Sequence, residues 1–244
     1  MILILLLLVI VMSSTSSIKL YAFDISNYCS SVKIALEYKQ LSYEVIPPPS
    51  GYGSVEYKAI VPMGTIPGLV DDTTVISESQ VILEYLDQKY PNSRPIFISS
   101  DAALNARVRF VHRLHDLYLE PSIRSLFKHM DPSIRSNDIV KEKFDIFNSR
   151  LIQLENIISE EGPYIMGDTF TVAECILPPT LLMTDMMAEE LGESVKYDNH
   201  PRLKKWWLGI QLHSTISPIL CKARIATNEW IHKKKQGAIS KCSL

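Results

Sequence analysis

The sequence is poor in cysteine, and its cysteines lie far apart. The four are Cys29, Cys175, Cys221 and Cys242, and they form neither a CxxC pair nor a cysteine–histidine cluster. Zinc sites and disulfide frameworks need ligands at closer and more regular spacings. The pattern therefore favours reduced thiols, and it predicts no metal site.

An excess of charge of either sign is also lacking. The chain has 25 Lys and Arg against 27 Asp and Glu, and its formal net charge is −2. A nearly neutral chain has no global attraction to nucleic acid. The sequence "HKKKQGAISK" at 232–241 is locally basic, but no aromatic residue interleaves its lysines. We therefore interpret 233–244 as a solvated basic tail and expect no nucleic-acid partner.

The apolar N-terminus is too short to span a bilayer. The run from Ile2 to Met12 falls below the roughly 20 residues that a transmembrane helix needs. It has the length of a signal-peptide core, yet no Lys or Arg precedes it. A signal or anchor, a buried appendage and a misassigned start remain open for residues 1–17, which are left out of the fold argument.

Residues 18–90 alternate between strand and helix patterns. The stretches 18–23 and 41–48 read as strands, and 30–39 between them has apolar residues at helical spacing. Two short strands are expected on either side of a turn at Asp71 and Asp72. A helix should follow with Ser77 as its N-cap and stop before Pro91. Its expected common face consists of Val81, Ile82, Tyr85 and Leu86.

From residue 101 onward the pattern is helical. Long amphipathic runs cover 101–130 and 137–162, and the second is expected to end at Gly162. Further helices are expected at 171–191, 200–213 and 215–231. The sequence therefore predicts an α/β domain at 18–90, a linker at 91–100 and an all-helical domain at 101–232.

Four motifs in this order resemble the cytosolic glutathione transferases over residues 18 to about 225. They are "TIPGLVDD", "SESQVILEYL", "GDTFTVAECILPPTL" and "NHPRLKKWW". The resemblance implies a thioredoxin-like N-terminal domain followed by an all-α helical bundle. It also implies that Thr171 and Glu174 form the capping box of a helix start, with Phe170 as its hydrophobic staple and a role in folding. Trp206 and Trp207 are expected to pack in the bundle.

The resemblance also places a glutathione site on the α/β domain. The matching proline in the family, here Pro67, is cis and lets Ile66 present its backbone N–H and C=O to the cysteinyl part of glutathione, as a strand edge does. Glu78 and Ser79 begin a helix, where N–H groups and the helix dipole favour a carboxylate. Glu78 would pair with the ammonium group of the γ-glutamyl moiety.

Two residues compete for the catalytic role. Ser26 stands where the serine-type classes keep a hydroxyl that donates to the glutathione sulfur, which lowers the pKa of that thiol. Cys29 lies about one turn later and would instead form a mixed disulfide with glutathione, as cysteine-type members do. A third possibility is that neither acts. Tyr21 is a further candidate on the first strand, and it is expected to be partly packed.

Two positions depart from the family pattern. Asn27 stands where many members have proline, and Thr65 replaces a lysine that contacts the glycine carboxylate of glutathione. Weaker glutathione binding is expected as a result, with Ile66, Glu78 and Ser79 still in place.

His112, His115 and Asp116 lie on a helix that lines the second-substrate pocket in the family. His112 and Asp116 are four residues apart and share a helix face, as an acid–base pair would. A surface pair or a satisfied network in the core is the alternative interpretation.

We therefore expect an enzyme that transfers the glutathione thiolate to an apolar electrophilic small molecule, with glutathione as co-substrate and no cofactor. A homodimer in the cytoplasm is expected on family grounds; a secretory or membrane location is the alternative if 1–17 is a signal or anchor. A glutathione-dependent isomerase of the maleylacetoacetate isomerase type, a disulfide reductase and a non-catalytic binding module remain alternative functions.

Overall fold

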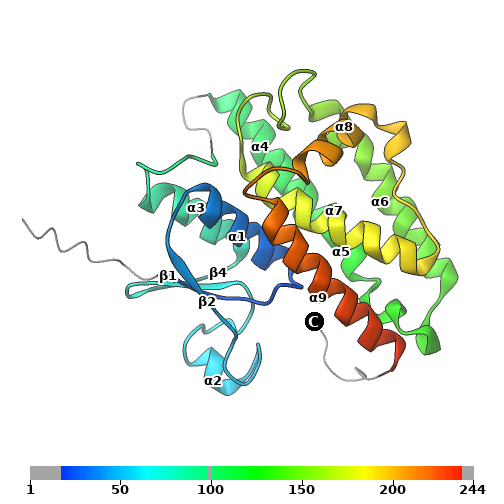
Figure 1. The fold of residues 1–244 in the computed structure, drawn as a ribbon, viewed down its shortest axis with the longest axis horizontal. Helices are drawn as coiled ribbons and strands as arrows, with labels where there is room; N and C mark the ends of the chain where they lie inside the picture. The colour runs from blue at the N-terminus through cyan, green and yellow to red at the C-terminus, as the bar shows by residue number, and fades with distance from the viewer. Residues whose placement is uncertain (1–17, 98–100, 238–244) are drawn as a thin grey trace, which may run out of the picture.

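The computed structural model describes residues 18–97 and 101–237. The expectations for residues 1–17, and for the basic tail beyond residue 237, lie outside the described residues. Figure 1 shows a small sheet with its own helices in the left half of the view and a larger helical body in the right half. The predicted fold class, a thioredoxin-like α/β part followed by an all-α bundle, is confirmed.

The sheet has four strands in the order β2-β1-β3-β4. Strands β1 and β2 pair in parallel, and the β1–β3 and β3–β4 pairs are antiparallel. Parallel neighbours need a crossover, which is helix α1. Helices α1 and α3 cover one face of the sheet, and α2 lies on the opposite side (Figure 1). The bounds are β1 Ile18–Tyr21, α1 Asn27–Tyr38, β2 Tyr43–Ile46, α2 Val55–Lys58, β3 Gly68–Asp71, β4 Thr74–Ser77 and α3 Ser79–Lys89.

Helix α2 was not predicted from the sequence. It is only four residues long, which is too short for a periodic pattern to show. Ser54 caps it by accepting a hydrogen bond from the N–H of Tyr57 over 3.0 Å. Tyr57 is fully buried and packs with Tyr21 and Val61 on this face of the sheet. Helix α2 therefore supplies Tyr57 as the buried residue that packs on the second face of the sheet.

The prediction for the start of α3 was wrong. Ser77 is the last residue of β4, and Glu78 occupies the N-cap position, where its side chain makes no capping hydrogen bond. Val81 was also misplaced: it is 52% exposed, whereas Leu83 is buried in the core. The chain turns from β4 into α3 at Glu78, which has φ +70°, so the helix begins one residue later than an N-cap at Ser77 would place it.

The helical part is less regular than its sequence pattern. The expected run at 101–130 divides into α4, a π-helical turn, α5 and a 3₁₀ turn. Helix α6 ends at Ile157, where Ile158 turns to extended backbone, and Gly162, with φ +84°, belongs to a later tight turn against Gly167. The bounds are α4 Ala102–Leu114, π turn η1 His115–Leu119, α5 Glu120–Arg124, η2 Phe127–Met130, η3 Pro132–Ile134, α6 Asn137–Ile157, α7 Val172–Leu191, η4 Tyr197–Asn199, α8 Pro201–Ile210 and α9 Ser217–Lys235.

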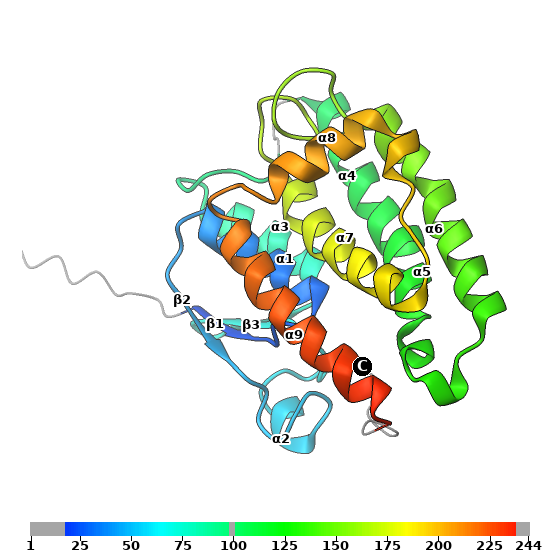
Figure 2. The ribbon, with the colours of Figure 1, turned by 45° about the vertical axis from the view of Figure 1, so that its right-hand side comes forward.

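Helix α7 is the centre of the bundle and is buried almost all round (Figure 2). The expected capping box at its start is present: Thr171 accepts from the N–H of Ala173, and the Glu174 carboxylate accepts from the N–H of Thr171 over 2.8 Å. Trp206 and Trp207 of α8 are buried, in agreement with the expected packing role.

The two parts are held together through α1 and α7. The rings of Tyr38 and Phe170 stack with centroids 3.8 Å apart and an angle of 9°. Asp87 of α3 accepts from the ammonium of Lys39 over 2.6 Å and from the N–H of Ile96 over 3.0 Å. These contacts fix the chain where it leaves the sheet part.

Candidate functional site

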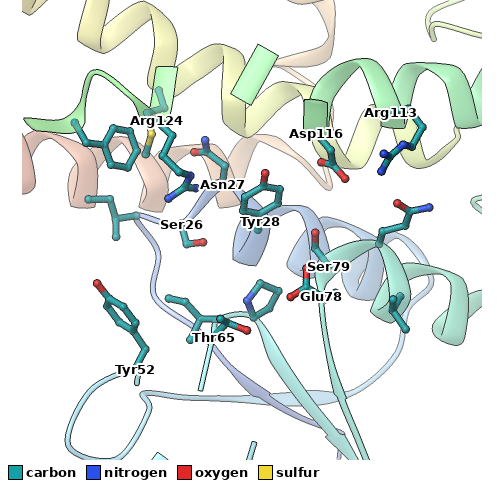
Figure 3. A pocket seen from close by; sticks show the side chains of 17 residues that line it. Ser26, Asn27, Tyr28, Tyr52, Thr65, Glu78, Ser79, Arg113, Asp116 and Arg124 are labelled. Carbon is teal, nitrogen blue, oxygen red and sulfur yellow. The ribbon is translucent and has the colours of Figure 1, made fainter. Parts of the chain in front are cut away.

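A cavity of about 620 Å³ lies between the sheet part and the helical part. Figure 3 shows its side chains. They come from the start of α1 and the loop before it, the loop before α2, the turn before β3, the start of α3, and the helical elements α4, η1, α5, η2 and α7. The lining residues are Ile25, Ser26, Asn27, Tyr28, Tyr52, Thr65, Ile66, Pro67, Glu78, Ser79, Gln80, Val81, Arg113, Asp116, Arg124, Phe127 and Met183.

Ser26 lies in this cavity at the N-terminus of α1. Its backbone is extended, and its Oγ accepts a hydrogen bond from the N–H of Cys29 over 3.3 Å. N-capping uses the oxygen as an acceptor, so the hydroxyl hydrogen is not required for the cap. A ligand atom beside Ser26 therefore meets a hydroxyl donor at the positive end of a helix.

Cys29 does not line the cavity. Its side chain is fully buried among core residues between the sheet and α1. Burial raises the pKa of its thiol to about 11, although the nearby Ser26 hydroxyl opposes the shift. At neutral pH the group is a buried, protonated thiol, which is a poor nucleophile.

The turn before β3 contributes backbone rather than side-chain chemistry. The Ile66–Pro67 peptide bond is cis. Among the described residues, no backbone hydrogen-bond partner is found for the N–H or the C=O of Ile66. The Tyr57 hydroxyl donates to the carbonyl of Thr65 over 2.9 Å and so holds the turn from behind. The structure thus brings an unpaired peptide edge to the cavity.

The start of α3 forms a third side of the site. Glu78 has φ +70° and ψ 117°, a conformation that residues other than glycine rarely adopt and that is concentrated at functional sites. No side chain caps this end of α3 in the described part of the chain, and Ser79, Gln80 and Val81 all line the cavity. The first N–H groups of the helix are therefore available to an anion.

Asp116 is the one member of the predicted histidine–aspartate group that lines the cavity. His115 donates from Nδ1 to Asp116 Oδ1 over 2.7 Å, and its Nε2 lies 2.7 Å from Thr180 Oγ1. His112 Nε2 lies 3.5 Å from Asp116 Oδ2. Both imidazoles are buried, so they support Asp116 from behind and do not face a ligand.

The ionisation of this group follows from burial and contact. Burial lowers the pKa of His112 to about 4, which keeps that imidazole neutral. For Asp116, burial acts to raise the pKa, but the hydrogen bond from His115 and the two imidazoles outweigh it and lower the pKa. Asp116 is therefore a carboxylate at the cavity wall.

Five charged or aromatic residues that line the cavity were missed in the sequence: Tyr28, Tyr52, Arg113, Arg124 and Phe127. Tyr28 lies two residues after Ser26, and Arg124 stacks over its ring with the guanidinium carbon 5.5 Å from the centroid. Burial, followed by the charges of Glu120 and Asp116, raises the pKa of Tyr28 and keeps its hydroxyl protonated. Arg113 lies in the last turn of α4, just before the π turn. The sequence shows the helical spacing of the arginines. That spacing does not tell which face of the helix lies toward the sheet part.

Of the other residues singled out in the sequence, one lies in the core and two line the cavity. Tyr21 is 7% exposed and packs against Tyr57, away from the lining. Asn27 and Thr65, the two departures from the family pattern, both line the cavity.

Within the described ranges 18–97 and 101–237, no three His, Cys, Asp or Glu side chains gather in a way that would hold a metal ion.

In the same ranges, no helix is both long enough and apolar enough to cross a membrane.

A sheet part with an unpaired peptide edge and a helical bundle across a cavity define the class of two-domain thioredoxin-like transferases. Comparison with known proteins agrees with this class. The family model "Glutathione S-transferase, N-terminal domain" matches residues 20–94, and "Glutathione S-transferase, C-terminal domain" matches 115–211. The chain belongs to the glutathione S-transferase family.

Its relatives include both transferases and isomerases. It is 30% identical over 171 residues to glutathione S-transferase Z2 of Arabidopsis thaliana, which covers 68% of this chain and 76% of that protein. It is 29% identical over 198 residues to the maleylacetoacetate isomerase of Pseudomonas aeruginosa, with 77% and 88% covered. The Tau class glutathione S-transferase of mango, Mangifera indica, shares the fold with a TM-score of 0.74 at 21% identity, over 88% of this chain and 99% of that one.

Proposed function

We propose that the protein is a glutathione transferase that uses Ser26 to activate the thiol of bound glutathione. The observation that carries the proposal is the meeting of three features in one cavity. These are the Ser26 hydroxyl, the unpaired backbone of Ile66 and the open N-terminus of α3 at Glu78 and Ser79. Figure 3 shows Thr65, the residue before Ile66, and the pair of Glu78 and Ser79 on different sides of Ser26, which suits the cysteinyl backbone and the γ-glutamyl end of one bound glutathione.

Each part of glutathione then has a partner of matching chemistry. The γ-glutamyl carboxylate accepts from the N–H groups and the hydroxyl at Ser79, and the adjacent ammonium pairs with Glu78. The cysteinyl peptide pairs with the N–H and C=O of Ile66 as an added strand does. Thr65 is uncharged and offers no cation to the glycine carboxylate, so we expect a modest affinity for glutathione.

The reaction follows from the placement of the sulfur. The Ser26 hydroxyl donates to the sulfur and stabilises the thiolate, while the thiol proton leaves to solvent. The thiolate attacks the electrophilic carbon, its lone pair forms the new C–S bond, and the leaving group departs with the electrons of the broken bond. Holding both reactants in one cavity removes several kcal/mol of entropic barrier. Glutathione is a co-substrate, and no step asks for a further cofactor.

The test combines binding with turnover. Calorimetry should show binding of glutathione and of S-methylglutathione, and both should raise the melting temperature. Ser26→Ala should lower kcat/KM for conjugation about 10- to 150-fold, since a hydrogen bond to a charged group contributes about 1.5–3 kcal/mol. Cys29→Ala, a buried control, should keep the activity of the folded fraction. Absence of binding at millimolar glutathione would contradict the proposal.

Three alternative functions can be tested with the same protein preparation. The similarity to a maleylacetoacetate isomerase keeps glutathione-dependent isomerisation as a second candidate, and turnover of that substrate alone would select it. Disulfide reduction needs an accessible thiolate, and the burial of Cys29 is unfavourable for it. Binding without any turnover would select the non-catalytic module. A homodimeric, cytoplasmic protein remains part of the proposal.

A further inference from the structure

The helical wall of the cavity is charged, although an apolar wall was expected for the second substrate. Five residues of this wall line the cavity, and three of them carry charge: Arg113, Asp116 and Arg124. The other two are Phe127 and Met183. A wall that selects only apolar electrophiles would leave these charges without a function in binding.

The two arginines lie over different parts of the site. Figure 3 shows Arg113 beside Asp116, on the side of the cavity where Glu78 and Ser79 lie. Arg124 lies at the other end, on the side of Ser26 and Tyr28. Arg124 is therefore the cation nearer to the place where the electrophile must meet the sulfur, and this inference rests on the function proposed for Ser26.

Arg124 is held in place before any ligand arrives. Its guanidinium forms an ion pair with Glu120, one turn earlier, whose side chain is 3% exposed. The guanidinium carbon lies 5.5 Å from the ring centroid of Tyr28 and 5.2 Å from that of Phe127. A planar cation packed against two rings loses little conformational freedom when it binds an anion.

The guanidinium still has donors to offer. It has five N–H groups, and Glu120 is its one ion-pair partner among the residues that the structure describes. The side chain is 38% exposed at a wall residue of the cavity. A guanidinium with free N–H groups binds a carboxylate with two parallel hydrogen bonds, a geometry that lysine does not reproduce.

We propose that Arg124 binds a carboxylate of the second substrate, and that the preferred electrophile is therefore an anionic, carboxylate-bearing compound. Its reactive carbon faces the sulfur beside Ser26, and its carboxylate faces Arg124. The carboxylate takes no part in bond making: the C–S bond forms and the leaving group departs as for a neutral electrophile. Arg124 sets specificity and leaves thiol activation to Ser26.

The experiment compares two electrophiles that differ by one carboxylate. Chlorodinitrobenzene is neutral and chlorodinitrobenzoate is anionic, and both lose chloride when a thiolate attacks. The wild-type ratio of kcat/KM, anionic over neutral, should fall about 10-fold or more in Arg124→Gln, because a charge-assisted pair is lost. Arg124→Lys should restore only part of it, and added salt should lower the wild-type ratio. Arg109→Gln, at an exposed arginine of α4 outside the cavity, is the matched control.

The outcomes separate this inference from the proposed function. Equal losses for both electrophiles would show that Arg124 serves glutathione or the fold, and an unchanged ratio would show that it binds no substrate carboxylate; either result overturns the inference. If the wild-type protein conjugates neither compound, the proposed function fails, and the unreactive pair dinitrobenzoate and dinitrobenzene tests Arg124 by calorimetry. Preferential binding of dinitrobenzoate that is lost in Arg124→Gln supports the inference, and equal binding of the pair contradicts it.

Discussion

The N–H of Cys29 donates to Oγ of Ser26 across 3.3 Å, so the residue that we propose to activate glutathione also caps helix α1. The oxygen serves the helix, and the hydrogen remains available to a sulfur. Loss of Ser26 therefore has two effects, on the stability of α1 and on the pKa of the bound thiol. Substitutions exist that separate them.

Ser26→Asp should keep the cap and remove the activity. Aspartate is as good an N-cap as serine, but as a carboxylate it has no hydrogen to donate and repels a thiolate. Ser26→Ala should lose the activity and also about 0.5–2 kcal/mol of unfolding free energy. Urea denaturation and kcat/KM for conjugation measure the two effects, and an active Ser26→Asp protein would exclude the proposed role of the hydroxyl.

The pair of Asp24 and Lys33 should stabilise the loop that carries Ser26. Lys33 Nζ lies 2.5 Å from Asp24 Oδ1, and the lysine side chain is 7% exposed against 44% for the aspartate. Asp24→Ala leaves a buried ammonium without its partner. We expect the unfolding free energy to fall by about 1–3 kcal/mol, toward the lower end because solvent screens the exposed carboxylate. Lys33→Met removes the charge together with the need for a partner and should cost less. Equal losses would contradict this account.

Gly68 and Tyr57 lie in close contact behind the unpaired backbone of Ile66. A Cβ at Gly68 would lie 2.3 Å from the Tyr57 hydroxyl, which donates to the carbonyl of Thr65. Gly68→Ala should therefore displace the ring, weaken glutathione binding and destabilise the fold, while Tyr57→Phe should cost only about 0.5–1.5 kcal/mol. A methyl group at Gly209 in α8 would meet no atom within 4 Å, so Gly209→Ala should stabilise slightly and serves as control. Calorimetric titration and thermal denaturation measure both effects.

Two buried groups should oppose each other in the pH dependence of stability. Burial raises the pKa of Asp185 from 3.8 to about 6, and burial lowers the pKa of His112 from 6.5 to about 4. The stability that a raised pKa contributes is present below pH 3.8 and is lost as pH rises through about 6. The stability that a depressed histidine pKa contributes is present above pH 6.5 and is lost as pH falls through about 4.

Removing one of the two groups should therefore leave the effect of the other visible in the pH dependence of stability. Between pH 6.5 and 4, Asp185→Asn should lose stability more steeply on acidification than the wild type, and the shift of the Asp185 pKa sets a differential on the order of 2–3 kcal/mol. His112→Leu should change in the opposite sense over the same range. Unfolding free energies from urea titrations at several pH values measure the slopes. Parallel profiles for all three proteins would show that neither group titrates in the folded state as described.

The sequence predicted the elements whose side chains alternate or repeat over several turns. The strand at Ile18–Tyr21, the hairpin around Asp71 and Asp72 and the long helix at Val172–Leu191 all have such patterns, and the capping box of Thr171 and Glu174 is a local signal. Helix α2 and the observed start of α3 have no such repeating pattern. Glu78 takes its positive φ from the packing of β4 and α3, which no local pattern reports.

The site divides in the same way. Ser26, Ile66, Pro67 and Ser79 come from short segments with recognisable neighbours, and the structure brings them into one cavity. Arg113 and Arg124 belong to amphipathic helices, where an exposed charge is the usual expectation. Whether such a charge meets solvent or a cavity depends on how the helices pack across α7, and the helical pattern alone does not contain that information. The burial of Cys29 depends likewise on the sheet beneath it.

The π-helical turn at His115–Leu119 makes the wall of the cavity sensitive to chain length. Such a turn contains one residue more than an α-helical turn, and one residue corresponds to about 100° of rotation. Deleting the exposed Leu117 would let α4 continue into α5 as a regular helix, and Asp116 and Arg124 would no longer face the cavity together. We therefore expect the loss or gain of one residue at this turn to change which charges face the cavity, while Ser26 and Ile66 on the sheet part stay in place.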